Sequence, residues 1–313
     1  MNYVERKEEE LKKKVIEQTM KDDFESFWRE EVKKLRMIPL EIVRKKVYFP
    51  YEKTFVTYEI TYNTHDNTRV NAYFSVPVNS NGQKMPCVAC FHGGRGNKEI
   101  YPDIVSTGVC CFAIDVRSQE GTTIDKGNYE IGDFNGSLLS RGVLDKNSFY
   151  MKNIYLDAIR AIDVIKELPE VDSEKIVTFG QSQGGALSIV SAALSGGVKK
   201  CYAAVPSYNC LWERVELGSG VFEATKAFLT KFPQYTDVVF ENLTYFDVNN
   251  MVSLLNVPVS ICLGLKDPIC LPEFVYSVYE HIPSEKEIHI VPFTPHVIPK
   301  VYKYFAYDEF SKL

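Results

Sequence analysis

Between residues 175 and 194 an apolar run, a Gly-x-Ser-x-Gly turn and a stretch of small residues follow one another. This order predicts a buried strand, a tight turn and a helix. Such a turn is a nucleophile elbow, which lifts Ser182 above the sheet on a strained backbone. Gly180 and Gly184 flank the serine, where a side chain would collide with neighbouring backbone. The motif also occurs by chance in glycine-rich βα turns, so its meaning depends on partners elsewhere in the chain.

Serine hydrolysis needs a histidine base and an acid that orients it; in α/β-hydrolases the acid follows the serine and the histidine comes last. Asp267 follows the apolar run 257–265, and His296 follows the last predicted strand, 286–291. Both lie at the carboxyl ends of strands, where open α/β sheets place their sites. Ser182, Asp267 and His296 are therefore the predicted catalytic residues.

Asp267 and His296 could each also have a purely structural role. Asp267 could simply cap a turn before Pro268, and His296 could be an ordinary loop histidine. The chain has five histidines. Of the others in this region, His281 is expected at the end of a helix and His289 inside a strand. Neither is where the base of a serine hydrolase belongs.

The transition state of acyl transfer carries an oxyanion, which needs two hydrogen-bond donors. One is expected to be the backbone N–H of Gln183, the first residue after the nucleophile. The other is expected from the loop after the apolar strand 86–91, which begins with His92 and two glycines. This loop is similar to the His-Gly-Gly motif of lipases and esterases, so we assign the second donor to the N–H of Gly94. The glycines could also only form a tight turn, and His92 is expected to be structural.

Around the elbow, strand and helix patterns alternate, which predicts an α/β fold with a mostly parallel, doubly wound sheet. Between residues 46 and 78 the period changes to two, which predicts antiparallel edge strands. His65 falls in a polar turn here and is expected at the surface. Another turn is predicted at 79–82. The remaining predicted strands are 86–91, 109–116, 201–205, 257–265 and 286–291, and the predicted helices of this part are 149–168, 272–281 and 300–310.

Two segments lie outside this alternation. Residues 4–20 and 22–36 are predicted to be helices that pack on the outside of a single domain, 1–313. Residues 208–250 carry many aromatic side chains in helical fragments, which is typical of a lid-like insertion or a pocket wall. Most of these aromatics could equally form the insertion's own small core.

Composition excludes several function classes. The 313 residues are 45% hydrophobic and 25% charged, with a net charge of −5, so a nucleic-acid partner is not expected. Neither a membrane-spanning stretch nor the apolar core of a signal peptide is evident. The eight cysteines lie mostly in apolar runs, which favours reduced thiols and a cytoplasmic location. Cys87 and Cys90 would point to opposite faces of a strand, so no metal site is expected from them.

With these residues identified, the chain resembles the carbohydrate esterase family that groups acetyl xylan esterases with cephalosporin C deacetylases. The resemblance covers nearly the whole chain and is strongest over 142–185 and 264–270. The family signature is Arg-Gly-Gln, Gly-x-Ser-Gln-Gly and His-Glu. Its middle part is intact here; Ser118 and Val297 each replace one residue of the other two. The family often has a tyrosine where this chain has Gly94. These departures leave the triad untouched.

The resemblance implies an α/β-hydrolase fold and a serine esterase that removes small acyl groups, chiefly acetyl, from acetylated sugars, xylooligosaccharides or cephalosporin C. It implies no cofactor and no metal. Members are typically intracellular homo-oligomers, often hexamers, so we expect a cytoplasmic homo-oligomer that acts on a small acyl ester. An α/β-hydrolase peptidase or a longer-chain carboxylesterase would have the same fold. A non-enzymatic hydrolase-like binding protein is a third reading, against which the intact Ser/Asp/His set argues.

Overall fold

The computed structural model describes residues 1–49, 53–78, 82–218 and 220–313. Its strands form one sheet in the order β1-β2-β3-β5-β4-β6-β7-β8-β9. Strands β1 to β3 pair antiparallel with one another, as does β3 with β5, and all later pairs are parallel. The predicted mostly parallel sheet with antiparallel N-terminal strands is therefore confirmed. The strands are β1 (Val43–Val47), β2 (Phe55–Asn63), β3 (Arg69–Pro77), β4 (Met85–Phe91), β5 (Cys110–Ile114), β6 (Val171–Gln181), β7 (Lys200–Ala204), β8 (Val259–Gly264) and β9 (Lys286–Val291).

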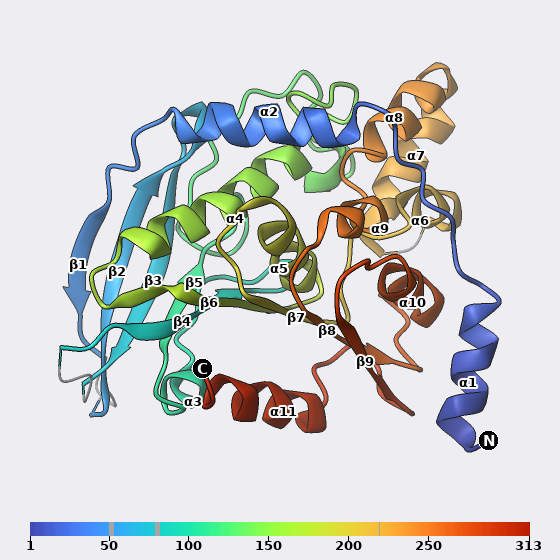
Figure 1. Ribbon diagram of the computed structural model, residues 1–313. Coiled ribbons are helices and arrows are strands. Elements are labelled where there is room, and N and C mark those ends of the chain that lie inside the picture. The colour runs from blue at the N-terminus through green and yellow to red at the C-terminus, as the bar shows by residue number, and fades with distance from the viewer. Residues whose placement is uncertain (50–52, 79–81, 219) are drawn as a thin grey trace.

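Helices cover both faces of the sheet (Figure 1). One face carries α4 (Tyr150–Glu167), α5 (Gln183–Leu194) and α10 (Pro272–Glu280), and the other carries α3 (Pro102–Val105) and α11 (Lys300–Phe310). Because both faces are covered, the central strands are apolar on both sides. Cys87 belongs to one buried cluster and Cys90 to the opposite one, as their spacing predicted.

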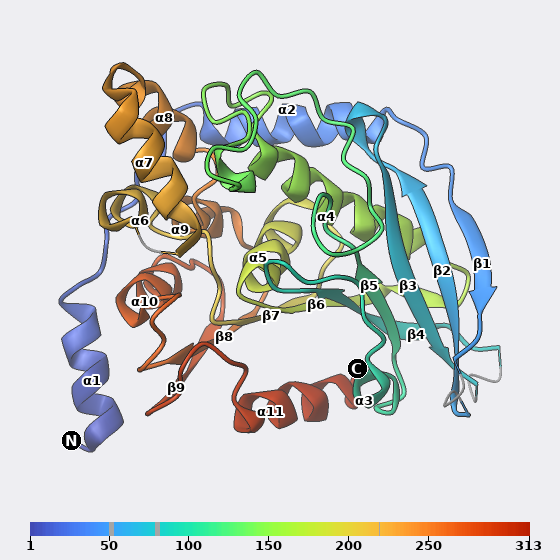
Figure 2. The ribbon, with the colours of Figure 1, turned by 180° about the vertical axis from the view of Figure 1, so that it is seen from behind.

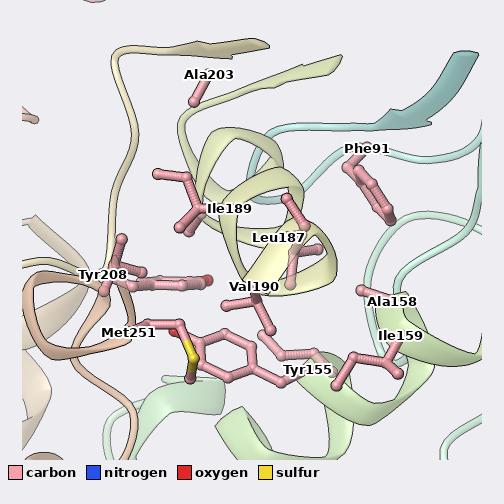
Figure 3. Close-up of a cluster of buried hydrophobic side chains, with 14 of the residues drawn as sticks. Phe91, Tyr155, Ala158, Ile159, Leu187, Ile189, Val190, Ala203, Tyr208 and Met251 are labelled. Carbon is pink, nitrogen blue, oxygen red and sulfur yellow. The ribbon is translucent and has the colours of Figure 1, made fainter. Parts of the chain in front are cut away.

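The elbow helix α5 lies at the centre of the larger core. Its apolar side chains pack beside α4, as Figure 3 shows for Leu187 and Val190 next to Tyr155 and Ile159. All four side chains are fully buried. Burying aliphatic and aromatic groups of this size contributes about 1.5–3 kcal/mol each relative to exposure. The helix that follows the predicted nucleophile is thus held by fully buried contacts with α4.

The N-terminal helix is shorter than predicted. Helix α1 (Tyr3–Lys12) begins at a capping box on Asn2 and ends well before residue 20. The chain that follows is not helical because other acceptors satisfy its backbone: Ile16 donates to Ser277 Oγ at 2.9 Å, and Thr19 donates to Asn250 Oδ1 at 2.9 Å. Helix α2 (Phe24–Arg36) then packs across α4, and the indole of its buried Trp28 donates to the Tyr245 carbonyl at 2.8 Å.

His65 is not the surface residue that its polar turn suggested. Its side chain is only 16% exposed, and Nε2 lies 2.7 Å from Asn153 Oδ1 on α4. The neighbouring Asp66 forms an ion pair with buried Arg117, which draws the turn toward the core. The turn predicted at 79–82 has its first three residues outside the described part of the chain.

The predicted insertion consists of short helices beside the carboxyl ends of the strands (Figure 2). Its aromatic residues pack largely on one another: the rings of Phe228 and Tyr235 stack at 6.0 Å, and Trp212 meets Phe240 edge-on at 5.5 Å. They are not a separate core, however, because Phe222, Phe228 and Tyr245 belong to the main buried cluster of the molecule. The helices are α6 (Leu211–Leu217), α7 (Glu223–Lys231), α8 (Thr236–Leu243) and α9 (Val248–Met251).

Short 3-10 helices complete the chain: η1 (His65–Asn67), η2 (Leu138–Ser140), η3 (Gly220–Phe222), η4 (Pro233–Tyr235) and η5 (Val252–Leu254). Among the described residues, every helix is too short or too polar to cross a lipid bilayer.

Candidate active site

The predicted nucleophile occupies a strained backbone conformation. Ser182 joins β6 to α5 with φ 57° and ψ −120°, a region that residues with a side chain rarely adopt. Its N–H donates to the Ala204 carbonyl at 3.0 Å, and its carbonyl accepts from the Ser207 N–H at 3.0 Å. The end of β7 thus holds the serine backbone from both sides, which is what a nucleophile elbow requires.

The two glycines of the elbow are required by close backbone contacts. A Cβ on Gly184 would lie 1.9 Å from the Phe91 carbonyl oxygen, and a Cβ on Gly180 would lie 2.3 Å from the Gly184 carbonyl oxygen. Neither atom can move aside, because Phe91 belongs to the neighbouring strand β4 and Gly184 to the start of α5. The elbow therefore packs tightly against the strand that leads into the predicted oxyanion loop.

The predicted acid and base contact each other directly. His296 follows β9 and Asp267 follows β8, and His296 Nδ1 lies 2.7 Å from Asp267 Oδ2. The other carboxylate oxygen, Oδ1, accepts from the backbone N–H groups of Ile269 at 2.8 Å and Cys270 at 2.9 Å. Burial lowers the pKa of His296, but Asp267 and Cys270 outweigh it and raise that pKa to about 9. The carboxylate is therefore fixed and oriented to stabilise an imidazolium.

Ser182 and His296 line the same cavity, which has a volume of about 1260 Å³. It lies over the carboxyl ends of the parallel strands and below the insertion. In the described part of the chain, no hydrogen bond joins the Ser182 hydroxyl to His296, a contact that often tightens only when substrate binds. The structure therefore brings acid and base into contact and places the predicted nucleophile in the same cavity.

Both predicted oxyanion donors also line this cavity. Gln183 is the first residue of α5, and the first N–H groups of a helix have no partner within it. Gly94 lies in the loop after β4, which is held by His92. The Val116 N–H donates to His92 Nε2 at 3.0 Å, so Nδ1 carries the proton and donates to the Gly93 carbonyl at 2.8 Å. Burial lowers the pKa of His92, which keeps the ring neutral in this structural position.

A pair of glutamines connects the predicted oxyanion donors. Gln119 and Gln183 exchange side-chain hydrogen bonds, at 2.7 and 3.2 Å. Gln119 Oε1 also accepts from the Arg95 N–H at 2.9 Å, next to Gly94. Tyr208 donates to Gln183 Oε1 at 2.7 Å from the start of the insertion. Sequence patterns do not reveal this network, although both glutamines belong to the signature motifs.

The irregular loop that forms one wall of the cavity is held by a cluster of buried ion pairs. Arg117 is fully buried and forms ion pairs with Asp66, Asp125 and Asp157 at 2.5, 3.0 and 2.6 Å. Asp125 also pairs with Arg141, which lines the cavity, at 2.9 Å. A buried arginine without such partners would be strongly destabilising. The cluster thus fixes the irregular loop that forms one wall of the site.

Part of the cavity lining is polar. It includes Glu120, Asp133, Asn135 and Ser137 from the irregular loop, together with Glu223 on α7. Side chains of this kind offer hydrogen-bond donors and acceptors rather than an apolar channel. These polar side chains lie among apolar ones such as Ile124, Leu139 and Val221, so the cavity offers both hydrogen-bonding and apolar contacts.

One group of three potential metal ligands is present in the described ranges. It consists of Asp267, Cys270 and His296, so it coincides with the predicted acid and base.

Comparisons with known proteins find a family and solved structures that are similar over nearly the whole chain. Residues 1–311 match the model of the acetyl xylan esterase (AXE1) family. Acetyl esterase Axe7A from Xylanibacter ruminicola is 28% identical over 282 residues, which are 88% of this chain; the chain spans 63% of the length of that enzyme. The structure of acetyl xylan esterase from Paenibacillus sp. R4 superposes with a TM-score of 0.91 at 28% identity, covering 100% of this chain and 99% of that one. Acetyl xylan esterase 1 from Thermoanaerobacterium sp. JW/SL YS485 gives 0.89 at 26% identity, over 97% and 98% of the two chains.

Proposed function

The chain belongs to the acetyl xylan esterase (AXE1) family, and from this membership we propose that it is a serine esterase that removes acetyl groups from acetylated sugars. Because the family is named for acetyl xylan, acetylated xylooligosaccharides are the first candidate substrates, and cephalosporin C is a further one. The observation that carries the proposal is the strained Ser182 in one cavity with the His296–Asp267 pair. Strain at a non-glycine residue persists only where the surrounding structure enforces it, which is typical of a functional site.

In the first step, His296 Nε2 accepts the Ser182 proton while the serine oxygen attacks the ester carbonyl carbon. Asp267 orients the ring through Nδ1 and stabilises the imidazolium that forms. The N–H groups of Gly94 and Gln183 donate to the oxyanion of the tetrahedral intermediate. The intermediate collapses when the alcohol oxygen leaves with the proton from His296, and the acyl group remains on Ser182.

In the second step, a water molecule replaces the alcohol. His296 accepts one proton from the water as its oxygen attacks the acyl carbon, and the same two N–H groups hold the new oxyanion. Return of that proton to Ser182 breaks the acyl–enzyme bond and releases acetic acid. Each group thus returns to its starting protonation state.

The polar part of the cavity lining fits the alcohol portion of such a substrate. A sugar presents several hydroxyl groups, and the side chains of Asp133, Asn135 and Glu223 can pair with them. The volume of about 1260 Å³ exceeds what an acetyl group needs, so most of the space serves the leaving alcohol.

Hydrolysis of a p-nitrophenyl ester series from acetate to octanoate tests the proposal, with Ser182→Ala as the control variant. We expect a preference for acetate that the variant loses while remaining folded. A rate that rises toward octanoate would favour a longer-chain carboxylesterase, and cleavage of amino-acid amides would favour a peptidase. Substantial activity in Ser182→Ala would reject the serine mechanism, and failure of a fluorophosphonate probe to label wild-type Ser182 would point to a binding protein.

We further propose a cytoplasmic homo-oligomer, with a hexamer as the specific expectation. The support is the resemblance to a family of intracellular oligomers and the set of buried free cysteines. Light scattering on the eluate of a size-exclusion column measures the subunit number, and a monomer at micromolar concentration would reject this part. Fractionation of expressing cells tests the location.

A further inference from the structure

Cys270 lies against the predicted acid and base, in a position that the reaction does not use. Its Sγ, one carboxylate oxygen of Asp267 and one ring nitrogen of His296 all lie within 4.8 Å of one another. Cys270 is 1% exposed and Asp267 is 3% exposed. The turn that carries both is held by N–H groups of Ile269 and Cys270, which donate to Asp267 Oδ1. The arrangement is therefore built into the fold and is not an incidental surface cluster.

We propose that Asp267, Cys270 and His296 form a binding site for a thiophilic divalent cation, Zn²⁺ or Cd²⁺, and that the bound cation switches off the esterase. Thiolate, imidazole and carboxylate are the three ligand types that zinc takes in proteins. With metal–ligand distances of about 2.0–2.3 Å, the donors of a tetrahedral zinc ion lie about 3.3–3.6 Å apart. Three donors already within 4.8 Å reach that geometry through side-chain movements of about an ångström or two, and water takes the fourth position.

Charge balances when the cation binds. In the catalytically active form, the ligand set is an Asp267 carboxylate, a Cys270 thiol and a neutral His296 with its proton on Nδ1. Where the ring is an imidazolium, binding releases the Nδ1 proton to solvent and Nε2 keeps its own proton. From the neutral form, binding releases the thiol proton to solvent and moves the imidazole proton from Nδ1 to Nε2, so that Nδ1 can coordinate the metal. The thiolate and the carboxylate then neutralise the two charges of the cation. The metal and its ligands together carry no net charge. This matters because an unpaired charge beside the buried Asp267 and Cys270 would be strongly destabilising.

The shift of the imidazole proton explains the loss of activity. The mechanism requires an unprotonated Nε2 on His296 to accept the Ser182 proton, and the metal-bound ring carries a proton there. The metal also replaces the hydrogen bond between His296 and Asp267. This inhibition rests on the proposed esterase function, whereas binding of the cation does not.

The cation has a route to the site. The His296 side chain is 22% exposed and lines the large cavity, so the cation reaches the ring from the cavity and passes to Asp267 and Cys270 behind it when the ring turns. The other cysteines do not offer the same ligands. Cys262, for example, is buried in β8, and the Asp267–Cys270–His296 group is the one found within the described residues. Cys262→Ala is therefore a matched control for Cys270→Ala.

Titration of purified protein with Cd²⁺ tests binding through the ultraviolet charge-transfer band of the Cd²⁺–thiolate bond. We expect a saturable band in the wild-type protein and in Cys262→Ala, and its loss in Cys270→Ala and Cys270→Ser. Loss of one ligand should weaken binding by at least about tenfold. Circular dichroism verifies that each variant is folded. A band of equal size in both folded Cys270 variants, or no band at millimolar Cd²⁺, would overturn the site.

Inhibition by Zn²⁺ is measured on the same proteins, each relative to its own metal-free rate. We expect the half-inhibitory concentration to rise at least about tenfold in the Cys270 variants and to stay unchanged in Cys262→Ala. Equal inhibition of all variants would overturn the switch. If the wild type binds Cd²⁺ through Cys270 but hydrolyses no ester, the proposed function fails while the metal site stands.

Discussion

Gln119 donates to Gln183 at 2.7 Å and accepts back from it at 3.2 Å, so the two amides form a closed pair beside the predicted oxyanion site. Gln119 follows β5 and Gln183 begins α5. The same Gln119 oxygen also accepts from the Arg95 N–H, one residue after Gly94. One side chain thus fixes the spacing between the two loops that carry the predicted oxyanion donors. Preorganised donors of this kind stabilise the transition state without reorganising during the reaction.

Gln119→Leu should lower kcat more than it raises KM, because the pair positions donors for the transition state and does not hold the substrate. Leucine keeps the volume but leaves Gln183 without its amide partner, and we expect kcat to fall about 10-fold or more. Steady-state hydrolysis of p-nitrophenyl acetate measures this. Gln234→Leu, at an exposed position in η4, is the control. An unchanged kcat in a folded Gln119→Leu protein would show that the pair does not position the donors.

Gly184→Ala should destabilise the fold as well as the site. The new Cβ would lie 1.9 Å from the Phe91 carbonyl oxygen, so strand and helix must move apart. Overpacking of this kind lowers the free energy of unfolding by about 1–3 kcal/mol. We expect the upper end here, because both clashing groups are backbone and cannot rotate aside. Urea unfolding measures the change. Gly132→Ala is the matched control, since a Cβ there meets nothing within 4 Å, and equal stability of the two variants would contradict the expectation.

Ester hydrolysis should rise with pH between 7 and 9. Burial acts to lower the pKa of His296, but Asp267 and Cys270 raise it to about 9. The mechanism needs the neutral ring, so the raised pKa moves the acidic limb of the rate profile upward. Burial lowers the pKa values of His65, His92 and His289, which therefore do not produce this limb. The kcat/KM profile of the free enzyme reports this pKa. A profile that is flat from pH 6 to 9 would contradict the assignment of His296 as the base.

Gly94→Phe should narrow the range of esters that the enzyme accepts. Gly94 does not have a left-handed φ, and a Cβ on it would meet no atom within 4 Å. Neither the backbone conformation nor close packing therefore requires a glycine at position 94. The missing side chain leaves free space in the cavity. We expect the butyrate and octanoate rates to fall by a larger factor than the acetate rate. Gln234→Phe, at an exposed position in η4 that is not part of the cavity lining, is the control. Equal loss across the series would show that position 94 does not limit substrate size.

Local patterns predicted the elements that depend on local chemistry. The predicted strand 286–291 coincides with β9, and the elbow was located because its glycines are needed within a few residues of Ser182. Chain order then placed Asp267 and His296 at neighbouring strand ends, where the structure joins them at 2.7 Å. Their catalytic roles remain predictions until the variants are measured.

Contacts between distant residues could not be predicted in this way. Gln119 and Gln183 are 64 positions apart, and no periodicity relates them. The end of α1 at Lys12 depends on acceptors such as Ser277, more than 250 positions downstream. His65 is half-buried because Asp66 pairs with Arg117. In each case a contact with a distant residue decides the structure, and the local sequence pattern does not contain that contact.

Much of the cavity lining comes from other parts of the chain than Ser182, Asp267 and His296. The predicted catalytic residues follow sheet strands, whereas much of the lining belongs to the loop around Asp133 and to α7, neither of which contributes to the sheet. Mutations in these lining segments therefore leave strand pairing and the alignment of Ser182, Asp267 and His296 intact. Over evolutionary time, substitutions in these lining segments alone can change which alcohol the cavity accepts. The residues predicted to break the ester bond then stay the same.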